Sequence, residues 1–159
     1  MNLKKILPQN GPPINEVSKY IKKYKNDLIV IKYGGNVFID RNIFDNFITD
    51  INILNRLGIS FAVVHGGGPR IKRELDKSNI QSKFIRGLRV TDEKIINIVE
   101  SVLIDFNNDI VESLKRCGTD AVSIHTKKNN IIKVNPEAKE LGFVGIPNKI
   151  DNNLIEKIL

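Results

Sequence analysis

Two short apolar runs, each closed by a glycine-rich loop, limit what this chain can fold into more than any other feature of its sequence. The runs cover residues 28–31 and 59–64, and the loops that follow them read Lys32-Tyr33-Gly34-Gly35 and His65-Gly66-Gly67-Gly68-Pro69. Short β-branched runs that end in glycine are typical of buried strands, and we expect the first run to be buried on both faces.

The segment between the two runs carries a helix pattern. Its apolar residues recur at helical spacing, Asp40 is placed to cap its start, and Gly58 is placed to end it. A strand, a helix and a second strand in succession form a βαβ unit, whose strands are parallel and joined by a right-handed crossover. We therefore expect both glycine loops at the same edge of one sheet.

The rest of the chain continues to alternate between helix and strand patterns. Thr91 or Asp92 is placed to cap a long helix, and Pro147 fits a strand only at an edge or a bulge because it lacks an N–H. In chain order we expect a helix from Pro69, a strand near residues 84–85, a loop at 86–89, a long helix over 93–116, strands at 121–125, 131–134 and 142–150, and a final amphipathic turn at 154–159.

The N-terminal part divides into two segments. Residues 1–14 contain Gly11-Pro12-Pro13 near their end and are expected to form a flexible arm, because paired prolines disrupt both helices and strand ladders. Residues 15–27 carry apolar side chains on one helical stripe and lysines elsewhere, which predicts an amphipathic helix capped by Asn15.

Length and composition exclude several classes of protein. The chain has 159 residues, 41% of them hydrophobic, enough for one domain with its own core. The single cysteine, Cys117, excludes a disulfide scaffold and a cysteine metal cluster. The sequence lacks an apolar run of membrane-spanning length and a signal-peptide core, so we expect a cytoplasmic protein. The net charge of +7 is scattered along the chain, so we expect no nucleic-acid partner.

Paired glycine loops favour an anion-binding site. Their backbone N–H groups can converge on a phosphate or carboxylate, the first loop adds Lys32, and the second adds a helix N-terminus. A tight turn between a strand and a helix explains a single glycine loop as well as ligand binding does. Two such loops together favour ligand binding. Neither loop has the spacing of a P-loop or a dinucleotide fingerprint, and the sequence lacks the Gly-x-Ser-x-Gly elbow of lipase-like hydrolases.

Other candidate groups have less specific signals. Arg89 lies just before a helix cap, where a loop could direct its guanidinium to a small acid, although an exposed ion pair with Asp92 or Glu93 explains it equally well. His65 and His125 are interpreted as hydrogen-bonded structural groups, and Cys117 as inert. Because the predicted crevice lacks an obvious base, we expect phosphoryl transfer to a carboxylate, which is a nucleophile at neutral pH without deprotonation.

Four segments of the chain carry a resemblance to a known family. They read Val30-Ile-Lys-Tyr-Gly-Gly-Asn36, Val63-Val-His-Gly-Gly-Gly-Pro69, Gly87-Leu-Arg-Val-Thr-Asp92 and Glu140-Leu-Gly-Phe-Val-Gly145. In their order and approximate spacing they resemble the amino-acid kinase family. The segment that discriminates most, residues 87–92, is similar to the members that phosphorylate N-acetyl-L-glutamate in arginine biosynthesis.

The resemblance implies a fold, a reaction and a set of site residues. The fold is an α/β three-layer αβα sandwich with a mainly parallel open sheet. The reaction transfers the γ-phosphoryl group of ATP, accompanied by Mg²⁺ that the nucleotide holds, to the side-chain carboxylate of N-acetyl-L-glutamate. The implied residues are Lys32 as the catalytic transition-state stabiliser, Gly34, Gly35 and Gly66 in the phosphate-binding loops, Gly67 and Gly68 as substrate contacts, and Arg89 as the clamp on the substrate α-carboxylate.

The resemblance also implies that the chain is partial. Residues 28–159 resemble the N-terminal, acyl-acceptor lobe of the family, and the nucleotide lobe is missing, so we expect the chain alone to be inactive. Residues 15–27 resemble a helix that joins copies of the protein into hexamers. An amphipathic helix that packs on its own subunit explains the same pattern equally well. A non-catalytic module that binds acyl amino acids or serves assembly is the second functional hypothesis.

Overall fold

The structure is a computed structural model of the whole chain and describes residues 2–34 and 40–158. Two compact units make up the chain: Met1–Gly66 with Ile110–Ala121, and Gly67–Asp109 with Val122–Leu159. None of the helices that the structure describes combines the length and the apolar composition that a membrane crossing requires.

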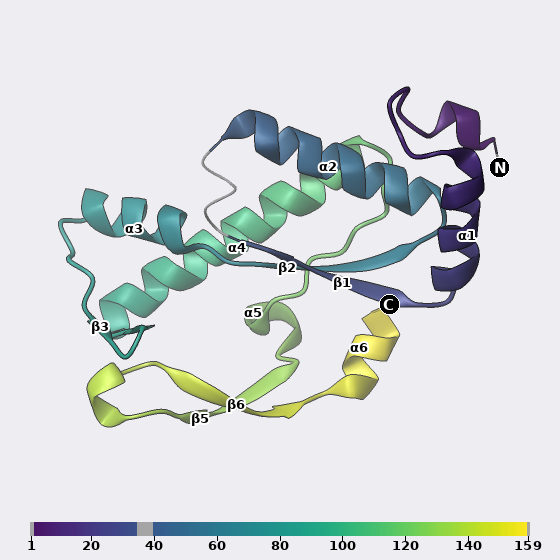
Figure 1. Cartoon of the computed structure of the whole chain (residues 1–159). Coiled ribbons are helices and arrows are strands. Elements are labelled where there is room, and N and C mark those ends of the chain that lie inside the picture. The colour runs from purple at the N-terminus through teal and green to yellow at the C-terminus, as the bar shows by residue number, and fades with distance from the viewer. Residues whose placement is uncertain (1, 35–39, 159) are drawn as a thin grey trace. The chain divides into compact units, whose positions relative to one another are not determined.

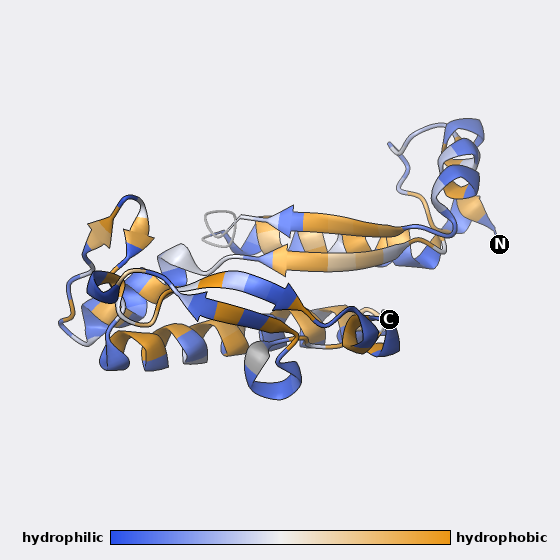
Figure 2. Ribbon diagram, turned by 90° about the horizontal axis from the view of Figure 1, so that it is seen from below, coloured by the Kyte–Doolittle hydropathy of each residue, from blue (hydrophilic) through white to orange (hydrophobic). Residues whose placement is uncertain are grey.

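The first unit contains the predicted βαβ arrangement. Strand β1 (Leu28–Tyr33) and strand β2 (Ser60–His65) are parallel and paired from Leu28 with Ser60 to Tyr33 with His65. Helix α2 (Arg41–Arg56) connects them and lies along one face of the pair (Figures 1 and 2). The α/β class and the parallel sheet are therefore confirmed.

Strand β1 is buried on one face only. Ile29, Ile31 and Tyr33 are half-buried or buried, and the Tyr33 ring stacks on Phe47 of α2 with a centroid distance of 3.8 Å. The alternate residues are exposed, and Val30 reaches 63% exposure. The prediction of burial on both faces was wrong, because α2 covers one face and the described part of this unit leaves the other open.

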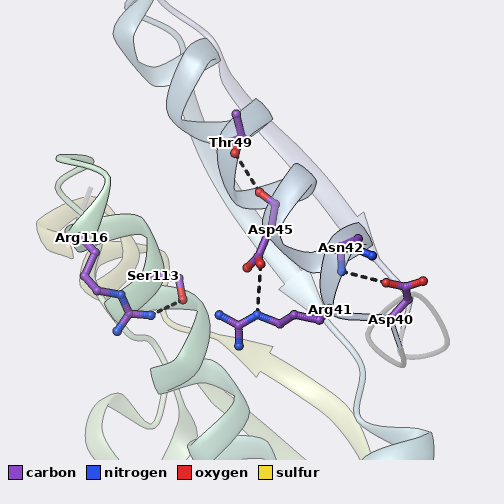
Figure 3. A network of polar contacts seen from close by, with 7 residues as sticks. All are labelled: Asp40, Arg41, Asn42, Asp45, Thr49, Ser113 and Arg116. Atoms are coloured by element: carbon purple, nitrogen blue, oxygen red, sulfur yellow. Dashed lines mark hydrogen bonds and ion pairs between the residues drawn. The ribbon is translucent and has the colours of Figure 1, made fainter.

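Helix α2 begins as the sequence predicts. The Asp40 carboxylate accepts a hydrogen bond from the Asn42 N–H at 2.7 Å and so caps the helix (Figure 3). In the first turns Arg41 pairs with Asp45 at 3.1 Å, and the Thr49 hydroxyl donates to the Asp45 carbonyl (Figure 3). The helix ends before Gly58, whose φ of 82° fits a left-handed C-terminal cap.

The N-terminal helix α1 (Ile14–Tyr24) forms, with a different start and end. It follows Pro13, and the side chain of Asn15 does not cap it, since Asn15 already lies within the first turn. The fixed φ of Pro13 positions the chain for the helix, so the cap residue is Pro13 rather than Asn15 and the helix begins at Ile14. Residues 1–14 were expected to be a flexible arm, and they contain a short 3₁₀ turn, Leu3–Lys5. A role of α1 in joining copies stays a prediction.

The second unit packs helix α3 (Gly68–Lys77) on the start of helix α4 (Glu93–Arg116). Its core cluster contains Ile71, Leu75, Ile95 and Val102. The α4 bounds match the prediction, and the Asp92 carboxylate, rather than the Thr91 hydroxyl, caps the helix by accepting from the Ile95 N–H at 2.8 Å. The last turns of α4 belong to the first unit, where Arg116 donates to the Ser113 hydroxyl (Figure 3).

A tight hairpin lies between these two helices. Strand β3 (Phe84–Ile85) pairs with strand β4 (Leu88–Arg89), so the predicted loop over residues 86–89 is partly wrong. Arg86 and Gly87 have φ of 51° and 81°, the two positive values that a two-residue turn of type I′ requires. Such a turn needs only two residues, so Leu88 and Arg89 return into the ladder.

The C-terminal part of the second unit forms a hairpin of its own. Strand β5 (Ile132–Pro136) pairs antiparallel with strand β6 (Gly145–Ile150), flanked by the short helices α5 (Thr126–Asn129) and α6 (Asn152–Ile158). Pro147 lies beside the register shift of this pair, as predicted. The predicted strand at residues 121–125 does not form, because among the described residues β5 pairs with β6 and leaves this segment without a ladder partner.

Candidate functional site

Lys32 lies on the open face of the parallel pair, near its carboxyl edge. It is exposed and pairs in register with Val64, whereas the next residue, Tyr33, points to the opposite face and stacks on α2. The alternation of side chains along a strand therefore directs Lys32 away from α2. Burial raises the pKa of the Tyr33 phenol above its ordinary value, so this hydroxyl stays protonated at neutral pH.

The two glycine loops leave the sheet at the same edge, as predicted. The last paired residues are Tyr33 and His65, and the Gly66 N–H donates to the Tyr33 carbonyl at 3.3 Å. Gly34 and Gly66 therefore start the two loops side by side. Because this contact occupies the Gly66 N–H, Gly66 joins the two loops rather than offering that donor to a phosphate. The predicted phosphate contact Gly35 lies outside the described residues.

The histidine in the second loop does not share the face of Lys32. His65 pairs with Tyr33, and residues paired in this register point to the same side of the sheet. The His65 Nδ1 atom lies 3.5 Å from the carbonyl oxygen of Gly66, in its own loop. This position agrees with the structural interpretation of His65.

Two further glycines of the second loop form the start of α3. Gly67 is the N-cap residue without a side-chain cap, and Gly68 is the first helical residue. The N–H groups of a first helical turn lack partners within the helix and favour an anion. A Cβ atom at Gly67 would lie 2.6 Å from the Leu103 Cδ2 atom, whereas one at Gly68 would meet nothing within 4 Å. Packing against Leu103 therefore explains why residue 67 is glycine, but packing does not explain the glycine at residue 68.

Arg89 of β4 is held by neutral groups. Its guanidinium donates to the Ser82 hydroxyl and lies over the Phe84 ring, 4.8 Å from the centroid. Among the described residues it pairs with neither of the carboxylates that the alternative interpretation named, and Asp92 caps α4 instead. A guanidinium has five N–H donors, so most of them remain for a ligand.

A contact between two of the four family-like segments holds the backbone next to Arg89. The Thr91 N–H donates to the Leu141 carbonyl at 3.0 Å, and the Phe143 N–H donates to the Thr91 carbonyl at 2.7 Å. Between them Gly142 has a φ of 67°, and a Cβ atom there would lie 2.2 Å from the Thr91 carbonyl oxygen. Sequence reasoning missed this contact, because neither spacing nor periodicity relates the two segments.

The candidate residues are thus divided between the units. Lys32, Gly34 and Gly66 lie in the first unit, and Gly67, Gly68 and Arg89 lie in the second. The first group offers a cation beside two loops, and the second offers a helix start and a guanidinium. Both groups suit anionic ligands. The described residues contain no group of three histidine, cysteine, aspartate or glutamate side chains placed to hold a metal ion.

Sequence comparisons show that this chain is similar to known enzymes. The profile of the amino acid kinase family matches residues 27–159. An acetylglutamate kinase of Pelagibacter ubique is 49% identical over 154 residues, which cover 97% of this chain and 54% of that protein. An acetylglutamate kinase of Clostridium acetobutylicum is 38% identical, over 92% of this chain and 52% of that protein. The chain therefore spans about half the length of these curated relatives.

Solved structures share the fold. The crystal structure of smu.665 from Streptococcus mutans has a TM-score of 0.73 and 27% identity, over 84% of this chain and 54% of that chain. N-acetylglutamate synthase from Neisseria gonorrhoeae, complexed with coenzyme A and N-acetyl-glutamate, has a TM-score of 0.74 and 21% identity, over 91% of this chain and 34% of that chain. The second likeness shows the fold alone. With a family profile that matches the chain from β1 to α6, the chain belongs to the amino acid kinase family.

Proposed function

We propose that this chain is the acyl-acceptor half of an acetylglutamate kinase, which phosphorylates N-acetyl-L-glutamate in arginine biosynthesis. The observation that carries the proposal is the 49% identity to the Pelagibacter ubique acetylglutamate kinase over 97% of the chain. The edge where the Lys32 and Gly66 loops leave the sheet supports it, because phosphoryl transfer needs a cation and N–H donors at one place.

In the proposed reaction a carboxylate oxygen of N-acetyl-L-glutamate attacks the γ-phosphorus of ATP. The bond from that phosphorus to the bridging oxygen of ADP breaks, and an acyl phosphate and ADP form without a proton transfer. Lys32 neutralises charge on the transferred group, and the family resemblance assigns Gly34 and Gly35 as its further contacts. Gly67 and Gly68 contact the acyl amino acid, and Arg89 binds its α-carboxylate.

Magnesium enters this proposal as part of the substrate MgATP. The described residues contain no group of three side chains that could hold the ion. Phosphate oxygens are ordinary ligands of Mg²⁺, which commonly binds through them with few protein ligands. We therefore assign no protein residue to the metal.

A chimera tests the proposed function directly. In it this chain replaces the matching part of the Pelagibacter ubique relative, of which it covers 54%. With N-acetyl-L-glutamate and MgATP we expect an acyl phosphate, which hydroxylamine converts to a measurable hydroxamate, and we expect none from the chain alone. A chimera that folds and binds N-acetyl-L-glutamate without forming hydroxamate would favour the non-catalytic binding module.

Gly68 and Gly67 provide a matched pair of variants for the substrate contact. We expect Gly68→Ala to leave the unfolding free energy of the chain within about 0.5 kcal/mol, because its Cβ atom meets no protein atom within 4 Å. Its Cβ atom should weaken N-acetyl-L-glutamate binding by about 1–3 kcal/mol through overlap with the ligand. Gly67→Ala should instead lower stability, because its Cβ atom overlaps Leu103. Calorimetry and chemical denaturation measure both quantities, and unchanged affinity in Gly68→Ala would remove that residue from the site.

Arg89→Ala tests the clamp on the α-carboxylate. We expect it to weaken N-acetyl-L-glutamate binding by about 1.5–3 kcal/mol, the usual contribution of a hydrogen bond to a charged group. The fold should change little, because among the described residues Arg89 makes no ion pair. Isothermal titration calorimetry of the chain measures the effect. An affinity equal to that of the unaltered chain would exclude Arg89 from the binding site.

A further inference from the structure

The guanidinium of Arg89 is fixed by its own hairpin before any ligand arrives. Its Nη1 group donates to the Ser82 hydroxyl, just before β3, and its Cζ atom lies over the ring of Phe84, the residue paired with it across the hairpin. Arg89 and Ser82 are both half-buried. Ser82 and Phe84, on one side of the hairpin, therefore restrict the side chain of Arg89 on the other side.

The backbone of this hairpin sets the register of these contacts. The two-residue turn at Arg86 and Gly87 places Phe84 opposite Arg89, and the Val90 N–H donates to the Lys83 carbonyl at 2.9 Å to extend the ladder. A shift by one residue would turn Arg89 to the other face of the hairpin. The Thr91 hydroxyl also donates to the Arg89 carbonyl at 2.8 Å.

The groups that hold Arg89 leave its charge intact. Ser82 is a neutral acceptor and Phe84 is a neutral ring, and no carboxylate pairs with Arg89 among the residues that the structure describes. Phe84 is 58% exposed, so it contacts the guanidinium outside the core. An arginine that is fully buried is almost always paired with an opposite charge, whereas Arg89 is only half-buried. This arrangement orients the cation and keeps it available for an anion.

We propose that Ser82 and Phe84 are positioning residues, which hold Arg89 so that it selects acceptors with an α-carboxylate. This inference rests on the proposed function and adds to it the residues that set acceptor selectivity. Pre-orientation reduces the conformational entropy that a long side chain loses when it binds a ligand. Removing the Ser82 hydroxyl should therefore weaken the interaction with the α-carboxylate and leave contacts with the rest of the acceptor unchanged.

Two ligands separate this role from a general loss of structure. N-acetyl-L-glutamate carries the α-carboxylate, and 4-acetamidobutyrate is the same molecule without it. We expect the unaltered chain to prefer the first ligand, and Ser82→Ala to bind it about three- to tenfold more weakly, with unchanged affinity for the second. Ser82→Thr keeps the hydroxyl and should keep the preference. Ser101→Ala, an exposed position on α4 in the same unit, is the matched control.

A second measurement on the free chain reports on the clamp itself. The Nε–H signal of Arg89 in an NMR spectrum should be sharp in the unaltered chain and in Ser82→Thr, and broadened by exchange in Ser82→Ala. Phe84→Leu, which keeps an apolar side chain but removes the aromatic face, should broaden it as well.

The outcomes separate the inference from the proposed function. If the unaltered chain binds both ligands equally, the role of Arg89 and this inference both fail. If the chain prefers N-acetyl-L-glutamate and Ser82→Ala retains that preference, only the inference fails. Equal weakening of both ligands in Ser82→Ala shows a structural role and also overturns the inference.

Discussion

Replacing Lys32 by alanine in the chimera is expected to lower turnover about 100- to 1,000-fold, the usual cost of removing one group that stabilises transition-state charge. The affinity for N-acetyl-L-glutamate should change little, because the lysine acts on charge that is redistributed as the phosphoryl group is transferred. Lys32 is exposed on the open sheet face, next to the edge where both glycine loops begin. It can therefore reach a ligand at that edge without distortion of the sheet.

The fold should tolerate this change. Among the described residues Lys32 makes no ion pair, and its side chain lies outside the contact of β1 with α2. The hydroxamate assay measures turnover, calorimetry measures binding, and thermal unfolding confirms the fold. Lys25→Ala, at an exposed position after α1, is the control for loss of one positive charge. Turnover within twofold of the unaltered chimera would exclude Lys32 from the stabilisation of the transition state.

Gly142→Ala is expected to lower the unfolding free energy of the chain by about 3 kcal/mol or more. Gly142 has a φ of 67° and a ψ of −122°, a sparsely populated backbone conformation that costs an L-residue about 1–3 kcal/mol. The added Cβ atom would also lie 2.2 Å from the Thr91 carbonyl oxygen, which belongs to the backbone and cannot rotate away. The two hydrogen bonds that join Thr91 to Leu141 and Phe143 must then lengthen or break.

Gly118 provides a control that separates the two contributions. It has a φ of 84° at the end of α4, and a Cβ atom there would meet nothing within 4 Å. Gly118→Ala should therefore cost only the backbone contribution of about 1–2 kcal/mol. Urea denaturation of both variants measures the difference. An equal loss in the two variants would show that the contact with Thr91 does not determine the effect.

Elements that depend on local chemistry were predicted well from the sequence. The Asp40 cap, the bounds of α4 and the place of Pro147 beside an irregularity are all confirmed. Each follows from a side chain and its immediate neighbours. The predicted strand at residues 121–125 failed because a strand also needs a partner, which local sequence does not identify. The predicted burial of β1 on both faces failed for the same reason, because local sequence does not show which faces of a strand are covered.

The candidate site was predicted in part. The shared edge of the two loops follows from the βαβ pattern, and the parallel register of β1 and β2 confirms it. The roles of Lys32, Gly68 and Arg89 come from a family resemblance and stay predictions. Residues that act through contact, such as Ser82 and Gly142, carry no sequence signal of their own, because serine and glycine are common in turns.

Periodicity, caps and crossover handedness act over short stretches of chain, so the amino-acid sequence was enough to predict the strand, helix and strand of the βαβ unit and the edge at which its glycine loops lie. Tertiary structure alone decided that Arg89 is held by Ser82 and Phe84, and that Gly142 lies against Thr91. The first contact depends on a hairpin register set by two backbone angles. The second joins segments separated by the whole of α4, and only folding brings such atoms within bonding distance.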